Sequence, residues 1–428
     1  MNRAASIQLP ATIPQRPDLA APFAQGAILL TLAVCVVVPH SFQLVNGALL
    51  ATSFLLSLLV VRKSDWLQKL MTTYLLGVAI TAFYIWLGTV HRAPRPASTQ
   101  TIIVYILSPF MWLMIGTVLY QQFGLERVVR ILIWLTWGAI ASVAAFFYLF
   151  LAFGVEAVRF LNANANVNVT EGFAGANIIV YGSLIFLTGA VFAQPTIIRN
   201  RIARVVLPGL LIVCALTSGR SALILSVPIG LLVGTVLRSR VDDPESKESG
   251  IKALLPTFAL GFVALLVLLI VDFFVDSFDL LVIFWIFYDE LTSGGGSERT
   301  EQIGALWEGV QNSWGLGVGH GIGVRYLRSA EFPWRYEVIP MATLLRVGFI
   351  GTLVYLSTFI VYALEFGRRS SARSLRAEDV YMFGGFVPVA LAVFTNPYIE
   401  SYVFQWMYFL PVLALGAQAG QAGSAPAR

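Results

Sequence analysis

Four arginines lie between positions 299 and 335, in a stretch that contains no lysine: Arg299, Arg325, Arg328 and Arg335. A fifth, Arg220, stands in the short sequence TSGRSA between two apolar runs. A guanidinium stays charged at neutral pH and can donate two parallel hydrogen bonds to one phosphate, whereas an ammonium is a point charge. This preference for arginine predicts a site for an anionic substrate group. Salt bridges to nearby acids are the alternative.

Glu337 and Arg346 flank the start of a predicted helix. Pro340 follows Glu337 closely, and proline is common in the first turn of a helix. Near that N-terminus the helix dipole favours a carboxylate, so Glu337 is a candidate base; a salt bridge to Arg335 or Arg346 is the alternative. Arg346 lies nine residues further on, inside an apolar run, where a charge is a candidate functional residue. At about 100° per residue the two side chains point to opposite sides of the helix, so we expect no direct pair.

Two elements position these residues. Residues 297–314, SERTEQIGALWEGVQNSW, predict an amphipathic helix on the membrane or on other helices, with one apolar face formed by Ile303, Leu306, Trp307, Val310 and Trp314. Arg299 falls on that face. The sequence GLGVGHGIG follows, with a glycine at every second position from 315 to 323. Such a backbone can approach another chain segment or a phosphate closely, and both roles stay open.

The composition excludes a water-soluble globular domain, because 57% of the 428 residues are hydrophobic, 12% are charged and the mean hydropathy is +0.78. About 20 apolar residues in a helix cross a bilayer. Twelve runs of this kind lie at 22–39, 44–61, 70–90, 101–120, 129–153, 173–192, 203–217, 221–237, 251–274, 339–366, 380–394 and 402–415. They predict an all-α polytopic membrane protein with about 12 transmembrane helices. Cys35 and Cys214 fall inside these runs and are expected to be packing residues.

The charges predict the topology. If the runs alternate direction, 19 of the 28 cationic residues, including every lysine, fall on the side of the N-terminus. The positive-inside rule then places both termini in the cytoplasm. Residues 1–271 hold transmembrane helices 1–9, residues 272–337 form an outer catalytic loop, and residues 338–428 hold helices 10–12. We expect a short interfacial stretch at 280–287, a glycine hinge at 294–296 and a flexible outer loop at 162–168.

Together these features resemble the bacterial O-antigen ligase and polymerase superfamily. The resemblance rests on about a dozen spans, one long outer loop before the last three, an arginine-led helix ending in Trp-Gly-x-Gly-x-Gly, and the pair Gly348 and Gly351. The SGRSA sequence around Arg220 and the TNP sequence at 395–397 are similar too. Ligases of the superfamily carry a histidine about eleven residues before the first glycine of the pair, where this chain has Glu337. The difference favours a polymerase over a ligase that transfers glycan to the lipid A core.

The resemblance implies a GT-C-like glycosyltransferase, independent of metals and cofactors, on the periplasmic face of the bacterial inner membrane. Its donor and acceptor would be glycans on undecaprenyl pyrophosphate, and it would polymerise O-antigen or exopolysaccharide repeat units with inversion. Candidate catalytic residues are Arg220 and Arg299, which would hold the pyrophosphate, and Glu337, which would activate the acceptor. Candidate substrate-binding residues are His320, which is also a second candidate base, Arg325, Arg328, Arg335 and Arg346. The expected partners are the bilayer, a chain-length regulator and a flippase, with no nucleic acid.

A transporter or flippase of a lipid-linked or anionic solute is the alternative from another class. Transporters tend to show repeated halves and charges near the middle of the membrane. The sequence shows no clear internal repeat, and most candidate charges gather at the outer face, which favours the enzyme.

Overall fold

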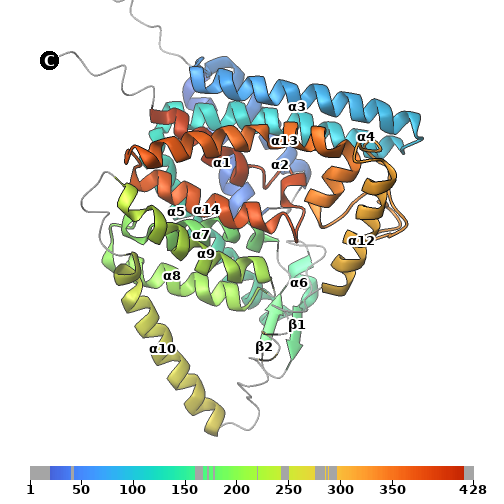
Figure 1. The fold of residues 1–428 in the computed structure, drawn as a ribbon. Helices are drawn as coiled ribbons and strands as arrows, with labels where there is room; N and C mark the ends of the chain where they lie inside the picture. Colours follow the sequence, from blue (N-terminus) through green and yellow to red (C-terminus); the bar gives the residue numbers. More distant parts are fainter. Residues whose placement is uncertain are drawn as a thin grey trace, which may run out of the picture.

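The computed structural model describes residues 20–39, 43–159, 167–170, 173–176, 179–218, 220–241, 250–274 and 296–418, together with Trp285 and Tyr288. Most of these residues are helical (Figure 1). Among them, five stretches are long and apolar enough to cross a membrane: Ala20–Val37, Asp65–Val90, Arg95–Phe153, Ser221–Arg240 and Ile339–Ser371. The prediction of a helical membrane protein is confirmed at this level. Every predicted apolar run coincides at least in part with a helix.

The helices fall into three groups along the chain. The first group is α1 (Ala20–Val37), α2 (Gln43–Val60), α3 (Asp65–Val90), α4 (Arg95–Thr101), the π-helix η1 (Ile102–Leu107), α5 (Ser108–Phe153) and α6 (Val155–Arg159). The second group is α7 (Val180–Ala193), η2 (Pro195–Ile197), α8 (Arg201–Leu216), α9 (Ser221–Leu237), η3 (Arg238–Arg240) and α10 (Gly250–Phe274). The last group is α12 (Gly296–Asn312), α13 (Ile339–Ser371), α14 (Ala377–Ala392), η5 (Tyr398–Glu400), α15 (Trp406–Ala414) and η6 (Leu415–Gln418).

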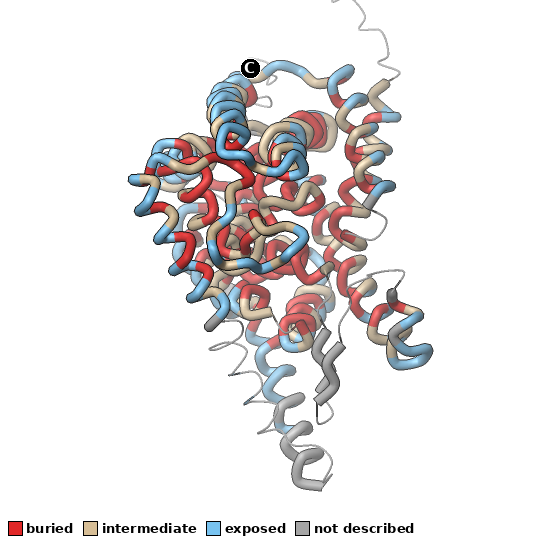
Figure 2. The backbone as a smooth tube through the Cα atoms, turned by 90° about the vertical axis from the view of Figure 1, so that its right-hand side faces the viewer, coloured by how far each residue is buried: buried red, intermediate tan, exposed pale blue. Residues whose placement is uncertain are grey.

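Helix α7 forms the centre of the molecule. Every residue of α7 is buried, as expected for a helix that is apolar on all sides. Figure 2 shows that buried backbone lies in the interior of the molecule, with exposed backbone around it. It packs against α9 and α14 through glycines: a Cβ on Gly230 would lie 2.5 Å from the carbonyl oxygen of Gly189, and one on Gly385 would lie 2.8 Å from the Phe186 ring. Small residues at such contacts let helices approach closely, which is how apolar helices associate where water does not drive them together.

Helix α5 changes direction at Gly124, whose backbone angles of φ 71° and ψ 164° are open mainly to glycine. On one side of this residue, Gln121 accepts a hydrogen bond of 2.9 Å from the backbone N–H of Arg62, just beyond the end of α2. On the other side, Gly138 lies next to Val37 at the end of α1. The fourth and fifth predicted runs are therefore the two arms of one bent element.

A small hairpin corrects the predicted boundaries near residue 173. Strand β1 (Val167–Thr170) pairs antiparallel with β2 (Phe173–Ala176), and α7 begins only at Val180. Residues 173–192 were predicted as one span, because a search for apolar runs does not separate a short strand from the helix that follows it. The alternation of valine and asparagine in VNVT favours a strand. Residues 162–166 of the predicted flexible loop lie outside the described residues, as do 280–284 and 286–287 of the predicted interfacial stretch and 294–295 of the predicted hinge.

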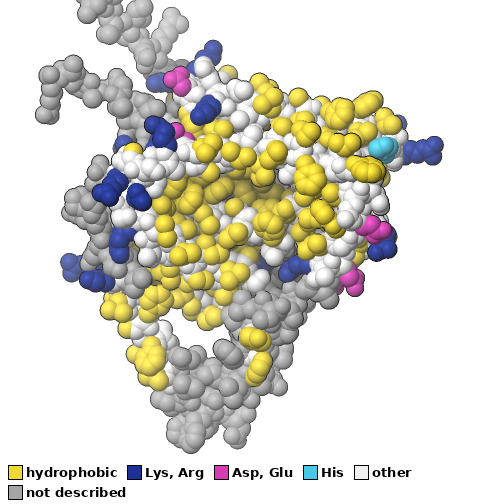
Figure 3. Space-filling model, viewed as in Figure 1, with side chains coloured by type: hydrophobic (Ala, Val, Ile, Leu, Met, Phe, Trp, Pro, Cys, Tyr) yellow, Lys and Arg dark blue, Asp and Glu magenta, His cyan; other side chains and the backbone are white. Residues whose placement is uncertain are grey.

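The surface has the pattern of a membrane protein. Figure 3 shows a broad apolar face over α13, α14 and α9, with lysine and arginine side chains gathered at its left edge. Acidic and basic side chains both occur at the opposite edge, near α12. A soluble monomer rarely exposes an apolar face of this extent. The apolar helices and this apolar face together indicate a membrane-embedded protein.

Candidate functional site

Helix α13 is interrupted at Gly348, where φ is 65° and ψ is −174°. The glycine-rich loop after α12 fills this break with its own backbone. Three hydrogen bonds of 2.9 Å join them: Val318 N–H to Leu345 O, Gly319 N–H to Arg346 O, and Phe349 N–H to Gly315 O. A Cβ on Gly317 would lie 2.6 Å from the Gly348 nitrogen, and one on Gly348 would lie 2.5 Å from the Leu316 carbonyl carbon. Of the two roles open for these glycines, close packing is the one that the structure shows.

The break changes the position of Arg346. The arm of α13 after Gly348, Phe349–Ser371, rises about 35 Å at 1.5 Å per residue, which is enough to cross a bilayer core of about 30 Å. Arg346 lies on the short arm before the break, at the end of the molecule where α12 packs. It therefore stands near one end of the bundle, although the sequence places it inside an apolar run.

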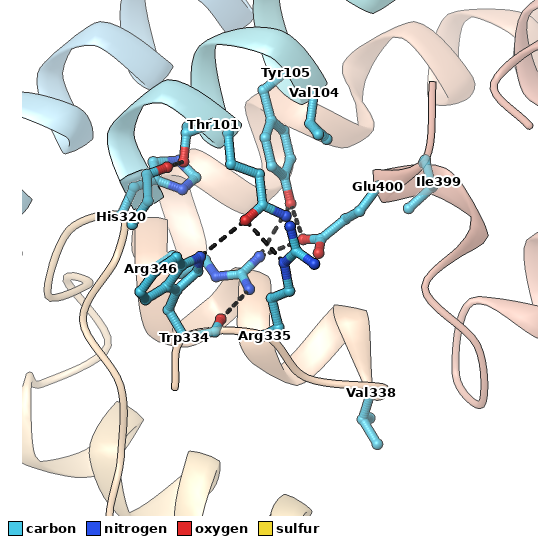
Figure 4. Close-up of polar contacts among 12 residues, drawn as sticks. Thr101, Val104, Tyr105, His320, Trp334, Arg335, Val338, Arg346, Ile399 and Glu400 are labelled. Carbon is cyan, nitrogen blue, oxygen red and sulfur yellow. Dashed lines mark hydrogen bonds and ion pairs between the residues drawn. The ribbon is translucent and has the colours of Figure 1, made fainter. Parts of the chain in front are cut away.

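Arg346 is the centre of a buried polar cluster (Figure 4). Its guanidinium pairs with the carboxylate of Glu400, and the two side chains are only 5% and 8% exposed. It also donates to the Tyr105 hydroxyl at 3.2 Å and to the Trp334 carbonyl oxygen at 2.8 Å. Tyr105, in the π-helix η1, donates to Glu400 at 2.5 Å. A buried guanidinium is stable only when its charge and its donors are matched, as they are here.

Arg335 lies beside this pair. Its Nε donates to the side-chain oxygen of Gln100 at 3.0 Å, and its guanidinium stacks 4.0 Å from the centre of the Phe332 ring. Burial lowers the pKa of Arg335, and the nearby carboxylates of Glu400 and Glu331 oppose that shift. Arg328 acts in the same direction as burial, so Arg328 and Arg335 are also close enough to repel each other.

Glu337 is held between two arginines. Its Oε2 lies 3.2 Å from Nε of Arg299 and its Oε1 lies 2.7 Å from Nη2 of Arg328. The Gln302 side chain fixes the backbone next to it by accepting from the N–H groups of Glu337 and Val338 at 2.8 Å and 2.9 Å. The carboxylate is 26% exposed, so solvent reaches it. The alternative of a salt bridge is correct for Glu337, but the partners are Arg299 and Arg328, not Arg335 or Arg346.

Arg220 reaches the same site from a distant part of the chain. It stands just before α9, and its Nη1 donates to the Tyr398 hydroxyl and, at 3.4 Å, to the side-chain oxygen of Asn396. Burial raises the pKa of Tyr398; Arg220 opposes the shift and the carboxylate of Glu337 adds to it. Glu337 therefore lies within electrostatic reach of the Tyr398 hydroxyl. Since Tyr398 and Glu400 share the turn η5, this turn connects Arg220 to the Arg346 pair.

These contacts and electrostatic interactions group five guanidiniums into one assembly, which we call the arginine cluster. Its members are Arg220, Arg299, Arg328, Arg335 and Arg346, with the carboxylates of Glu337 and Glu400 and the hydroxyls of Tyr105 and Tyr398. Positive charge exceeds negative charge even when the exposed Glu331 is included. Such an excess in a partly buried site favours an anionic ligand.

Two predicted site residues lie outside the arginine cluster. Arg325 is 80% exposed on its side chain and pairs with Glu308 at 3.3 Å. His320 is 2% exposed, and its Nε2 lies 3.0 Å from the Tyr355 hydroxyl, behind Tyr105. Burial, with Arg346 adding to it, lowers the pKa of His320 to about 3, so the imidazole is neutral at physiological pH. This position suits a packing residue better than a group that contacts substrate.

Helix α12 turns a different side to the protein than the sequence predicts. Its buried residues are Gln302, Ala305, Leu306 and Val310, whereas Ile303 and Trp307 are 42% and 43% exposed and Trp314 is 89% exposed. Apolar spacing does not distinguish a surface that faces protein from one that faces lipid. Arg299 lies on the buried side with Gln302, and this orientation brings it to Glu337.

Sequence reasoning missed Tyr105, Tyr398 and Glu400. Tyrosines are common in apolar runs, so nothing marks these two. Glu400 could have been found, because it is the only acidic residue after Asp379 and lies close to an apolar run. The TNP sequence did mark the turn that carries Asn396.

No protein-family model and no curated protein matches this chain.

Proposed function

We propose that this chain is a membrane glycosyltransferase that polymerises glycan repeat units carried on undecaprenyl pyrophosphate. The observation that carries the proposal is the arginine cluster, which gathers arginines from the start of α9, from α12 and from the loop before α13. Segments so far apart in sequence meet at one end of an apolar bundle, where a lipid-linked substrate can present its charged head group. We further propose that the chain has 12 transmembrane helices in a GT-C-like arrangement.

The reaction needs cations where the leaving group departs. In this proposal the acceptor hydroxyl attacks the anomeric carbon of the donor, a new carbon–oxygen bond forms, and the bond to the lipid pyrophosphate breaks with inversion. Arg220 and Arg299 stabilise the charge that develops on the pyrophosphate, as fixed hydrogen-bond donors do in other transfer enzymes. Glu337 takes the proton of the acceptor hydroxyl. Arg328 and Arg335 bind the same head group, while Arg346 holds the turn η5 in place through Glu400.

The proposed setting is the bacterial inner membrane, with both termini in the cytoplasm and the arginine cluster on the periplasmic face. The gathering of lysine and arginine side chains at the edge away from α12 supports this orientation (Figure 3). The proposed partners are the bilayer, a chain-length regulator and the flippase that supplies the substrate.

The test is a reconstituted assay with purified protein, undecaprenyl-pyrophosphate oligosaccharide and a chelator, with products resolved as a ladder on a gel. We expect a ladder when no lipid A core acceptor is present. A product that forms only with the core acceptor would make the protein a ligase. Movement of the substrate across the vesicle without any product would refute the enzyme and favour a transporter.

A further inference from the structure

The carboxylate of Glu337 occupies the position that suits a phosphate in the arginine cluster. One oxygen contacts Arg299 and the other contacts Arg328, at 3.2 Å and 2.7 Å. Two guanidiniums that each contact a different oxygen of one anion are a common arrangement for phosphate groups. The three side chains are 26% to 42% exposed, so a ligand can reach them from solvent.

We propose that Glu337 is an internal substitute for the substrate phosphate, which fills an anion subsite formed by Arg299 and Arg328 until a pyrophosphate displaces it. The inference rests on the proposed function, because a pyrophosphate ligand is taken from it. Displacement leaves the two guanidiniums bound to phosphate oxygens and frees the carboxylate of Glu337.

The local structure allows this exchange without refolding. Gln302 holds the backbone of Glu337 and Val338, so only the side chain of Glu337 must turn. The released carboxylate stays within electrostatic reach of Tyr398, next to Arg220. In the paired state both carboxylate oxygens of Glu337 contact guanidiniums, so neither oxygen is turned toward an acceptor hydroxyl, whereas the released carboxylate can accept its proton. The base would thus become available only when the donor is bound.

The exchange predicts opposite effects on binding and on turnover. If Glu337 occupies the subsite about nine-tenths of the time, it lowers the apparent affinity for pyrophosphate about tenfold. Glu337→Gln removes the competing charge, so pyrophosphate should bind about tenfold more tightly. The same variant lacks the base, so glycan transfer should fall about a hundredfold or more. A residue with a purely structural role would lower both quantities.

The test measures binding of inorganic pyrophosphate to the full chain in lipid nanodiscs by calorimetry. Glu308→Gln is the matched control, because it breaks the Glu308–Arg325 pair on the same helix but outside the arginine cluster, and its affinity should equal that of the wild type. Glu337→Ala should show the same gain as Glu337→Gln, which keeps the test valid if one variant fails to fold.

Each result has a distinct meaning. Tighter pyrophosphate binding by both Glu337 variants, with unchanged binding by Glu308→Gln, supports the proposal that Glu337 stands in for the phosphate. Wild-type affinity or weaker binding in folded Glu337 variants overturns it, while the proposed function stands because the wild type still binds pyrophosphate. A wild type and variants that all fail to bind pyrophosphate would overturn the proposed function as well.

Discussion

Glu400→Gln should destabilise the protein strongly, because it leaves the Arg346 guanidinium buried without its counter-charge. The two side chains are 5% and 8% exposed, and breaking a buried pair by removing one partner costs about 3–5 kcal/mol. The amide oxygen of the glutamine can still accept from Tyr105, so we expect the lower end of this range, about 3 kcal/mol of unfolding free energy. The variant should also lose activity, because Glu400 belongs to the turn that presents Tyr398 to Arg220.

The assay is the unfolding free energy of the purified protein by titration with a denaturing detergent. Glu126→Gln is the matched control, because Glu126 pairs with Arg130 at 2.8 Å and with Arg199 at 3.0 Å, but all three side chains are more than half exposed. The control should lose less than about 1 kcal/mol. The double variant Arg346→Met with Glu400→Leu should lose at least about 2 kcal/mol less unfolding free energy than the sum of the losses of its two single variants. If Glu400→Gln costs no more than Glu126→Gln, the pair does not hold the turn and the reasoning is wrong.

Three further predictions use other parts of the structure. Gly348→Ala should prevent docking of the glycine loop and lower the yield of folded protein, because an alanine disfavours the backbone angles at this position and its Cβ would clash with the backbone of Leu316. Gly367→Ala on the same helix has open space around it, so it should be neutral or slightly stabilising; size-exclusion chromatography and thermal unfolding measure both variants. His320 is neutral in the folded protein until about pH 3 but takes up a proton near pH 6.5 when unfolded. Its contribution to the free energy of unfolding is therefore intact above pH 6.5 and is lost as the pH falls toward 3, by about 1.4 kcal/mol per pH unit. His320→Gln should lack this slope, and an unchanged slope would contradict the burial of the imidazole. Arg299→Lys should reduce glycan transfer about a hundredfold or more, because an ammonium does not reproduce the guanidinium contacts. Arg130→Lys, at an exposed ion pair, should keep wild-type activity. Full activity of Arg299→Lys would remove Arg299 from the mechanism.

The sequence predicts the helical membrane class well, because long apolar runs have few other stable structures. It also marks Arg220, Arg299 and Glu337, which the structure brings to one site. Their contacts could not be read from spacing, because Arg220 and Tyr398 are 178 positions apart and meet only through tertiary packing.

The orientation of α12 shows a second limit of the pattern. A periodic apolar face on a membrane protein has two possible neighbours, protein or lipid, and the spacing of Trp307 and Ile303 is compatible with both. The polar Gln302, which interrupts the pattern, is the residue that packs inward, because it satisfies two backbone N–H groups at the start of α13. Polar residues that cap a neighbouring helix are therefore easily mistaken for solvent-facing ones.

The interruption of α13 makes the order of events during membrane insertion important. Until the glycine loop docks, the carbonyl groups of Leu345 and Arg346 and the N–H of Phe349 lack these partners, and a buried backbone group without a partner costs free energy comparable to a lost hydrogen bond. The loop precedes α13 in the chain, so it is synthesised before the helix that needs it. A loop that cannot dock leaves an unfinished helix exposed to the insertion machinery and to membrane proteases. Variants in residues 315–319 should thus reduce the amount of protein in the cell before they affect catalysis in the molecules that survive.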